Sequence, residues 1–219
     1  MSAAVFADAK IVQNIKSSGI MGQPPKNSTM TIYAKGSKAR MDMGTNGVYQ
    51  IIDVPAQKIF IVEPAKKSVM VMTAAQIKQT AGVLSQLGGN KEVTPPSVKK
   101  LGTSKTYNGF KCDEYKISMS SPMQSDGTYC ISPEIDLKKE LEGLMSFSKE
   151  FSQAFGGDLM NQIHGFPVHS ESTSSILGQT FTSSSDLVGV SHDSQPDSLF
   201  VIPADYKTVE MPTMPKINQ

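Results

Sequence analysis

Short segments in which apolar and polar residues alternate make up most of the chain, and they predict antiparallel β structure. Alternation is the mark of a half-buried strand, and strands that recur about every ten residues with short turns form a meander. Turn residues such as Gly44-Thr-Asn-Gly47 and Pro55 separate the segments. We expect strands over residues 9–16, 28–34, 39–43, 48–54, 58–62, 68–72, 98–105, 110–119, 127–131, 167–174, 179–191 and 198–202.

Two segments with a helical pattern interrupt these strands. Thr73-Ala-Ala-Gln76 is a capping box ahead of apolar residues, and Gly88-Gly89 ends this first helix. Ser132-Pro133 predicts the start of a longer helix that ends before Gly156, because proline favours the first helical position. Core packing against the sheet is the simplest role for its apolar stripe. The stripe consists of Leu137, Leu141, Leu144, Phe147, Phe151 and Phe155.

The domain organisation follows from the order of these elements. The segment 88–97 contains two prolines and is the best internal linker, but strands are predicted on both sides of it. We therefore expect a single α+β domain over residues 9–206, with a sheet of about ten strands. A short N-terminal segment (1–8) precedes the domain, and a C-terminal tail (207–219) follows it. Serine and threonine fill ten of the sixteen positions from 170 to 185, which we interpret as strands with a solvated face.

Composition narrows the range of functions. The 219 residues are 38% hydrophobic and carry a net charge of +1, which is ordinary for a globular domain. Arg40 is the only arginine, and arginine is the side chain best suited to phosphate recognition, so we do not expect a nucleic-acid partner. No apolar run approaches the ~20 residues of a transmembrane helix. The chain has 13 methionines and no tryptophan, and methionine serves both as core filler and as the lining of adaptable binding surfaces.

The two cysteines and the N-terminus bear on the compartment. Cys112 and Cys130 flank a predicted hairpin that would bring them together on neighbouring strands. They form either a disulfide, worth about 3 kcal/mol, or two buried thiols that pack as small hydrophobes. Ala4-Val-Phe-Ala7 has the small-x-small character found around signal-peptidase sites. We expect a periplasmic or otherwise exported protein whose signal peptide is not part of this sequence, and the alternative is a cytosolic chain with an alanine-rich start.

The sequence does not show the motifs of common catalytic sites. It has no Gly-x-Ser-x-Gly elbow, no His-Glu-x-x-His pair and no phosphate-binding Gly-Lys-Ser/Thr loop. We interpret His164, His169 and His192 as surface loop residues rather than as ligands of a zinc ion. The sequence therefore predicts a protein that is not an enzyme, without a cofactor or metal.

Five motifs, taken in order, carry a resemblance to a known group of proteins. The chain resembles the LolA/LolB-like (lipoprotein-carrier-like) superfamily, and most closely an uncharacterised exported bacterial family related to it. The motifs are Lys35-Gly-Ser-Lys-Ala-Arg-Met-Asp-Met43, Ile51-Ile-Asp53 with Lys58-Ile-Phe-Ile-Val-Glu-Pro64, Asn108-Gly-Phe-Lys-Cys-Asp-Glu-Tyr115, Gly165-Phe-Pro-Val168 and Ser198-Leu-Phe-Val-Ile-Pro-Ala-Asp-Tyr206.

The resemblance implies a strongly curved antiparallel sheet, which forms a half-open β-barrel with two helices over its concave face. It also implies an apolar cavity between the sheet and the helices, which in the carriers holds the acyl chains of lipoproteins. The Trp-rich lining of the carriers is absent here, and a predicted strand replaces their N-terminal helix.

The strand pattern indicates which residues would line such a cavity. Segments such as 58–62 and 68–72 are apolar at both alternating positions, so both faces of the sheet should be covered. The helix stripe, through Leu141, Leu144, Phe147 and Phe151, should form one wall of the cavity. The opposite, concave wall should consist of Met30, Ile32, Met41, Met43, Phe60, Val62, Met70 and Met72.

One polar residue near this wall has two possible placements. Arg40 lies outside the cavity beside Asp42 if Met41 and Met43 face inward, and in the opposite register it enters the cavity to hold a lid carbonyl or a lipid headgroup. The predicted function is non-catalytic binding or carriage of an apolar, lipid-like ligand, such as a lipoprotein acyl chain, in the bacterial cell envelope. The alternative is an envelope interaction or scaffolding module with a filled core, whose protein partner the sequence does not identify.

Overall fold

The computed structural model describes residues 8–19, 24–44, 46–77, 79, 96–120, 124–141, 147, 162–176 and 178–209. Twelve strands of this part form one sheet in the order β12-β6-β5-β4-β3-β2-β1-β11-β10-β9-β8-β7. The strands are β1 (Ala9–Ser17), β2 (Lys26–Lys35), β3 (Lys38–Asp42), β4 (Tyr49–Asp53), β5 (Lys58–Glu63), β6 (Ser68–Thr73), β7 (Ser97–Tyr107), β8 (Phe110–Met119), β9 (Gln124–Ser132), β10 (Phe166–Ile176), β11 (Gln179–Ser191) and β12 (Lys207–Val209). Two short 3₁₀ helices, η1 (Pro64–Lys66) and η2 (Asp197–Phe200), also belong to the described part of the chain.

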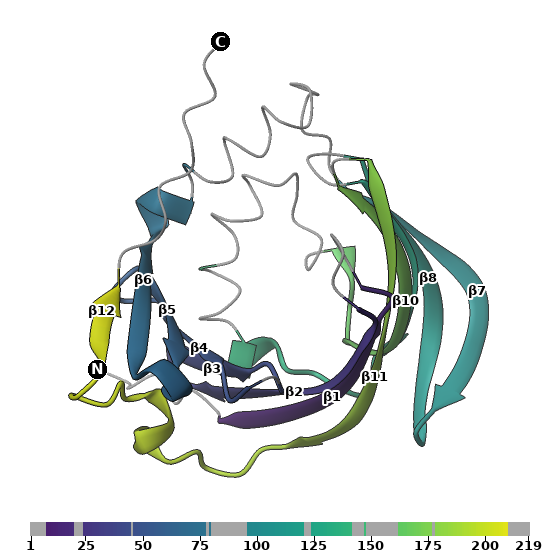
Figure 1. Ribbon diagram of the computed structural model, residues 1–219. Helices are drawn as coiled ribbons and strands as arrows, with labels where there is room; N and C mark the ends of the chain where they lie inside the picture. Colours follow the sequence, from purple (N-terminus) through teal and green to yellow (C-terminus); the bar gives the residue numbers. More distant parts are fainter. Residues whose placement is uncertain are drawn as a thin grey trace.

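The sheet is strongly curved and does not close, so β12 and β7 form its two edges (Figure 1). Adjacent strands are antiparallel except for β12, which runs parallel to β6. The expectation of a curved sheet is confirmed, whereas the described strands number twelve and the sheet is mixed.

Two details differ locally from the sequence prediction. Residues 197–200 form η2 where a strand was expected to begin, and β12 lies in the segment assigned to a C-terminal tail.

The predicted capping box forms at the end of β6. The Thr73 amide donates to Gln76 Oε1 at 2.9 Å, and the Gln76 amide donates to Thr73 Oγ1 at 3.3 Å. These two reciprocal bonds satisfy amides that the first helical turn leaves unpaired. Residues 74–77 are helical, and most of the expected helix after them lies outside the described residues.

The second helix begins later than predicted. Pro133 lies in a turn after β9, and helical residues start at 138, where the Lys138 amide donates to Asp136 Oδ1 at 3.0 Å. The Asp136 side chain, rather than the proline, therefore marks the start of this helix. Most of the helix, with Leu144, Phe151 and Phe155, lies outside the described residues, and so does the expected covering of the concave face.

The disulfide is one of the two alternatives left open by the sequence. Cys112 on β8 and Cys130 on β9 are bonded, with their Cα atoms 5.2 Å apart. Cys130 pairs with Glu114 in the strand register, so the bridge runs diagonally between neighbouring strands rather than between directly opposed residues. Both cysteines are buried, and each belongs to the larger apolar core of the molecule.

Candidate functional site

The strand register divides the residues of β2 to β6 between two faces of the sheet. Directly opposed residues of antiparallel strands share a face, and successive residues of one strand alternate. Ile32 pairs with Met41, and Ile61 pairs with Met70, while Gln50 pairs with both Met41 and Ile61. These pairs connect β2 through β6 along one continuous face.

The opposite face carries a closed apolar core. Tyr49, Ile51, Val62 and Val69 are all buried and contact Ile202 and Tyr206. The two contacting residues belong to the segment 192–206, here called the outer strap, which passes along the outside of the curved sheet between β11 and β12 (Figure 1). The core under the outer strap is therefore on the convex side, and the face with Met41 and Met70 is the concave one.

Six of the predicted wall residues lie on the concave side and form what we call the methionine wall. They are Met30, Ile32, Met41, Met43, Met70 and Met72. Met43 directly follows β3, continues its alternation and is 38% exposed, and the other five are half-buried. These six residues lie on one side of the sheet, and their contact with a ligand stays a prediction.

Phe60 and Val62 are a correction to the sequence prediction of the wall, because the register places them on the convex side. Val62 is fully buried there, and Phe60 packs against the same core under the outer strap. Their neighbours Ile59 and Ile61 take the concave positions on β5, opposite Met72 and Met70. Sequence periodicity could not separate these alternatives, since residues 59–62 are all apolar.

Arg40 lies on the convex side, so it does not enter the concave space. Its Nε donates to Asp42 Oδ1 at 2.7 Å, and its Nη1 donates to the Leu199 carbonyl of the outer strap at 3.2 Å. Its guanidinium carbon lies 3.7 Å from the centre of the Tyr49 ring. Burial raises the pKa of Tyr49, and the Arg40 charge opposes that rise. Arg40 thus fastens the outer strap to the sheet, a role that the sequence did not suggest.

Two lysines fasten the outer strap at either side of Arg40. Lys35 Nζ lies 2.9 Å from Asp197 Oδ1, and Lys67 Nζ lies 2.8 Å from Asp205 Oδ2. These hydrogen-bonded pairs lower the pKa of each aspartate and raise the pKa of each lysine. All of these side chains except that of Lys35 are well exposed, so the pairs position the segment more than they stabilise it.

The start of the second helix packs against β1 and β11 on the concave side. Leu137 and Leu141 are buried in a core with Ile11 of β1 and Leu187 of β11. Leu141 is therefore a packed core residue, and Ile32 of the methionine wall packs against the same core. Phe147 is half-buried, and Leu144 and Phe151 lie outside the described residues.

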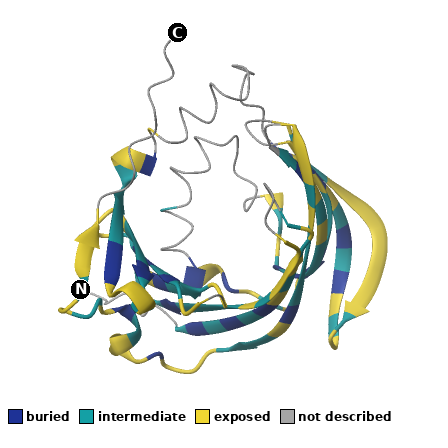
Figure 2. Cartoon of the chain, in the orientation of Figure 1, coloured by how far each residue is buried: buried dark blue, intermediate teal, exposed yellow. Residues whose placement is uncertain are grey.

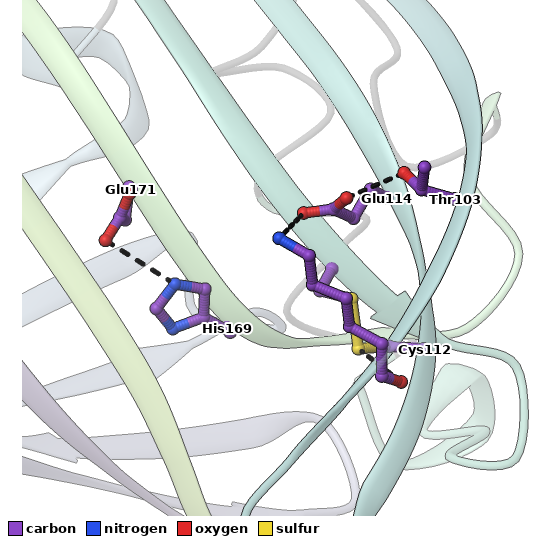
Figure 3. Close-up of polar contacts among 7 residues, drawn as sticks. Thr103, Cys112, Glu114, His169 and Glu171 are labelled. Atoms are coloured by element: carbon purple, nitrogen blue, oxygen red, sulfur yellow. Dashed lines mark hydrogen bonds and ion pairs between the residues drawn. A yellow bond between two sulfur atoms is a disulfide. The ribbon is translucent and has the colours of Figure 1, made fainter.

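A cluster of polar residues lies on the outer side of β8 to β11. The ring of His169 stacks on Tyr107 with centroids 4.0 Å apart, and its Nδ1 lies 2.7 Å from Asp186 Oδ1. Figure 3 shows His169 with Glu114, whose carboxylate accepts hydrogen bonds from Thr103 Oγ1 at 2.6 Å and from a lysine. His169 is a strand residue with a 15% exposed side chain, which corrects its interpretation as a loop residue.

The same outer side contains an open cavity of about 660 Å³, here called the outer groove. It crosses β1, β11, β10, β9 and β8, and its lining has no apolar side chain. The lining residues are Lys16, Ser17, Ser18, Lys116, Asp126, Gly127, Thr128, Glu171, Ser172, Thr173, Thr182, Ser183 and Ser184. Within the described part of the chain, no group of three or more His, Cys, Asp or Glu residues is arranged to hold a metal ion.

Several solved structures are similar to the molecule, all at very low sequence identity. An uncharacterized conserved protein from Thermus thermophilus is 9% identical, with a TM-score of 0.49, over 95% of this chain and 93% of that one. The Pseudomonas aeruginosa MucA/MucB complex gives 9% identity and a TM-score of 0.47, over 92% of this chain and 58% of that one. A putative outer membrane lipoprotein-sorting protein domain from Vibrio parahaemolyticus gives 6% identity and a TM-score of 0.36, over 89% of each chain.

Sequence comparison gives a family but no characterised relative. No curated protein matches the chain. Among the described residues, no helix has the length and apolar character needed to cross a bilayer. One family model covers residues 20–206, a range that includes β2 to β11. The chain therefore belongs to the family defined by the domain of unknown function DUF4412.

Proposed function

We propose that the protein binds an apolar, lipid-like ligand on the methionine wall and carries it without catalysis in the bacterial cell envelope. The main observation that supports this proposal is the contrast between the two faces of β2 to β6. The convex side holds a closed apolar core in which Tyr49, Ile51, Val62 and Val69 are buried under the outer strap. The concave side also buries Ala34, Ala39 and Ile52, but its methionines keep part of their surface exposed.

This contrast supports binding because the concave core is filled by other residues, such as Ile11 and Ala34, and does not bury the methionines. Most positions of β5 and β6 are half-buried (Figure 2). Methionine is unbranched and polarizable, so a row of these side chains adapts to ligands of different shape. Each ligand methylene removed from water contributes about 0.8 kcal/mol, so one long acyl chain gives useful affinity. The disulfide fits an oxidising compartment such as the periplasm.

The test is binding of a fluorescent fatty acid to two tryptophan variants, Met43→Trp and Met70→Trp. Both residues lie on the concave side, and a bulkier ring there should occupy the space of the ligand. We expect the wild-type protein to bind the fatty acid, and each variant to lose binding while its melting temperature barely changes. Val188→Trp is the matched control, because Val188 on β11 is 50% exposed and does not belong to the methionine wall.

The alternative of a filled core makes the opposite prediction for the same variants. In a filled core the added ring overpacks the interior and costs about 1–3 kcal/mol of stability at each site. Wild-type protein that binds neither the fatty acid nor an apolar dye would overturn the carrier proposal. An envelope scaffolding module would then be the better description of the protein.

A further inference from the structure

The outer groove has a regular construction that follows from the strand register. Lys16 on β1 pairs with Ser184, which pairs with Glu171. Glu171 pairs with Thr128, which pairs with Lys116 on β8. These five side chains therefore form one row across five strands, and the row lies on the same side as Lys10, Tyr33 and Arg40, which is the convex side.

The two lysines mark the ends of this row. Four strand spacings separate Lys16 from Lys116, or roughly 19 Å at 4.8 Å per strand. Within the described part of the chain, neither lysine forms an ion pair, whereas Lys100 and Lys105 on the neighbouring β7 are paired with Asp113 and Glu114. The groove thus presents two ammonium groups at a distance from each other and available to a ligand.

The floor between the lysines is made of hydroxyl and carboxylate groups. The hydroxyls of Thr128, Thr173, Thr182 and Ser184 share the convex side, and Asp126 there accepts a hydrogen bond from Ser118 Oγ at 2.6 Å. Ser172 and Ser183, which bond to each other at 2.9 Å, alternate with these residues and project to the other side of the sheet. Glu171 is 73% exposed, and its Oε1 lies 3.8 Å from His169 Nε2. Both carboxylates therefore keep acceptor positions for a ligand, and serine and threonine hydroxyls can donate and accept.

The chemistry of the lining selects the kind of ligand. An acyl chain is a poor match, since the lining has no apolar side chain. A nucleic acid is also a poor match, because the two lysines are balanced by Asp126 and Glu171. A polyhydroxylated molecule would donate its hydroxyls to the carboxylates and exchange hydrogen bonds with the serines and threonines. An anionic group on that molecule would accept a charge-assisted hydrogen bond from the ammonium group of Lys16 or Lys116.

We infer that the outer groove is a binding site for an acidic oligosaccharide. Its hydroxyls lie along the floor, and its carboxylates bind Lys16 and Lys116 at the two ends. A volume of about 660 Å³ is within the range of sites for small molecules. The site lies on the convex side and shares no residue with the methionine wall. It is therefore independent of the proposed lipid binding.

The experiment measures the binding of two trisaccharides by isothermal titration calorimetry, on protein with its disulfide intact. Trigalacturonic acid is the acidic probe, and maltotriose is the neutral one. We expect the acidic probe to bind more tightly, with an affinity that falls as salt is added. The variant K16Q/K116Q should bind it roughly tenfold more weakly or worse, the usual consequence of losing charged hydrogen bonds.

The control variant K58Q/K207Q makes the same change in net charge at exposed lysines of β5 and β12, far from the groove in the strand order. It should bind trigalacturonic acid like the wild type. Amide chemical shifts of the wild-type protein should change at Lys16, Thr128 and Glu171 on titration, which places the site without any variant. The inference is overturned if neither sugar binds, if maltotriose binds equally well, if both double variants lose affinity equally, or if the shifts change elsewhere.

Discussion

Replacing Arg40 by alanine tests how the outer strap is held on the convex side. The side chain is 18% exposed and makes three contacts, with Asp42, Tyr49 and the Leu199 carbonyl. A hydrogen bond from a charged donor contributes about 1.5–3 kcal/mol, and the guanidinium over a ring adds about 1 kcal/mol. The partly exposed pair with Asp42 adds about 0.5 kcal/mol. Because the three contacts are not independent, we expect Arg40→Ala to cost about 3 kcal/mol of unfolding free energy.

Urea denaturation measures this loss, and two further variants isolate its cause. Arg40→Lys keeps the positive charge but lacks the planar guanidinium group, so the variant should still lose about 2 kcal/mol of unfolding free energy. Lys38→Ala is the control on the same strand, since the Lys38 side chain is 44% exposed and its pair with Asp53 should be worth less than about 1 kcal/mol. A loss below about 1 kcal/mol for Arg40→Ala would refute the reasoning. The apolar contacts of Ile202 and Tyr206 alone would then hold the strap.

Three further predictions concern the other half of the sheet. Unfolded, unreduced protein should show no titratable thiol, and reduction of the Cys112–Cys130 bond should lower stability by about 3 kcal/mol in urea denaturation. Hydrogen bonds from Lys105 and Thr103 lower the pKa of Glu114 in the folded protein. The ionised Glu114 therefore stabilises the fold fully above the unfolded pKa of about 4.3, and this stabilisation is lost as the pH falls through the folded pKa. Glu114→Gln should therefore flatten the loss of stability in acid, and an unchanged acid profile would contradict the assignment. Gly127→Ala should cost about 1–3 kcal/mol, because its Cβ would lie 2.9 Å from the Glu171 carbonyl oxygen, whereas Gly189→Ala meets nothing within 4 Å and should be close to neutral in thermal unfolding.

Much of the strand layout could be predicted from the sequence because alternation and turn residues are local signals. The predicted segment 179–191 coincides with β11, and the Ser/Thr-rich stretch indeed forms β10 and β11. The capping box at Thr73 is equally local, and it forms as predicted. β12 was missed because it is three exposed residues long and pairs in parallel with a distant strand.

The candidate site was only partly predictable, since it depends on which face each residue takes. Met41 and Arg40 are neighbours in sequence, and alternation alone left two placements for the pair. The strand register with β2 and β4 decides between them. The Leu199 carbonyl that binds Arg40 comes from a segment about 160 residues away, and no local pattern predicts that contact. The outer groove was missed for the same reason, because its row of side chains comes from five strands.

The most direct test of the central claim is a palmitate titration of protein labelled with ¹³C at the methionine methyl groups. Binding on the methionine wall predicts saturable shifts for Met30, Met41, Met43, Met70 and Met72, with little change at Met119 on β8 in the other half of the sheet. Trp variants at Met43 and Met70 should abolish these shifts. Wild-type spectra that do not change with palmitate, or that change equally at Met119, would contradict the proposed carriage of an apolar ligand on the concave side.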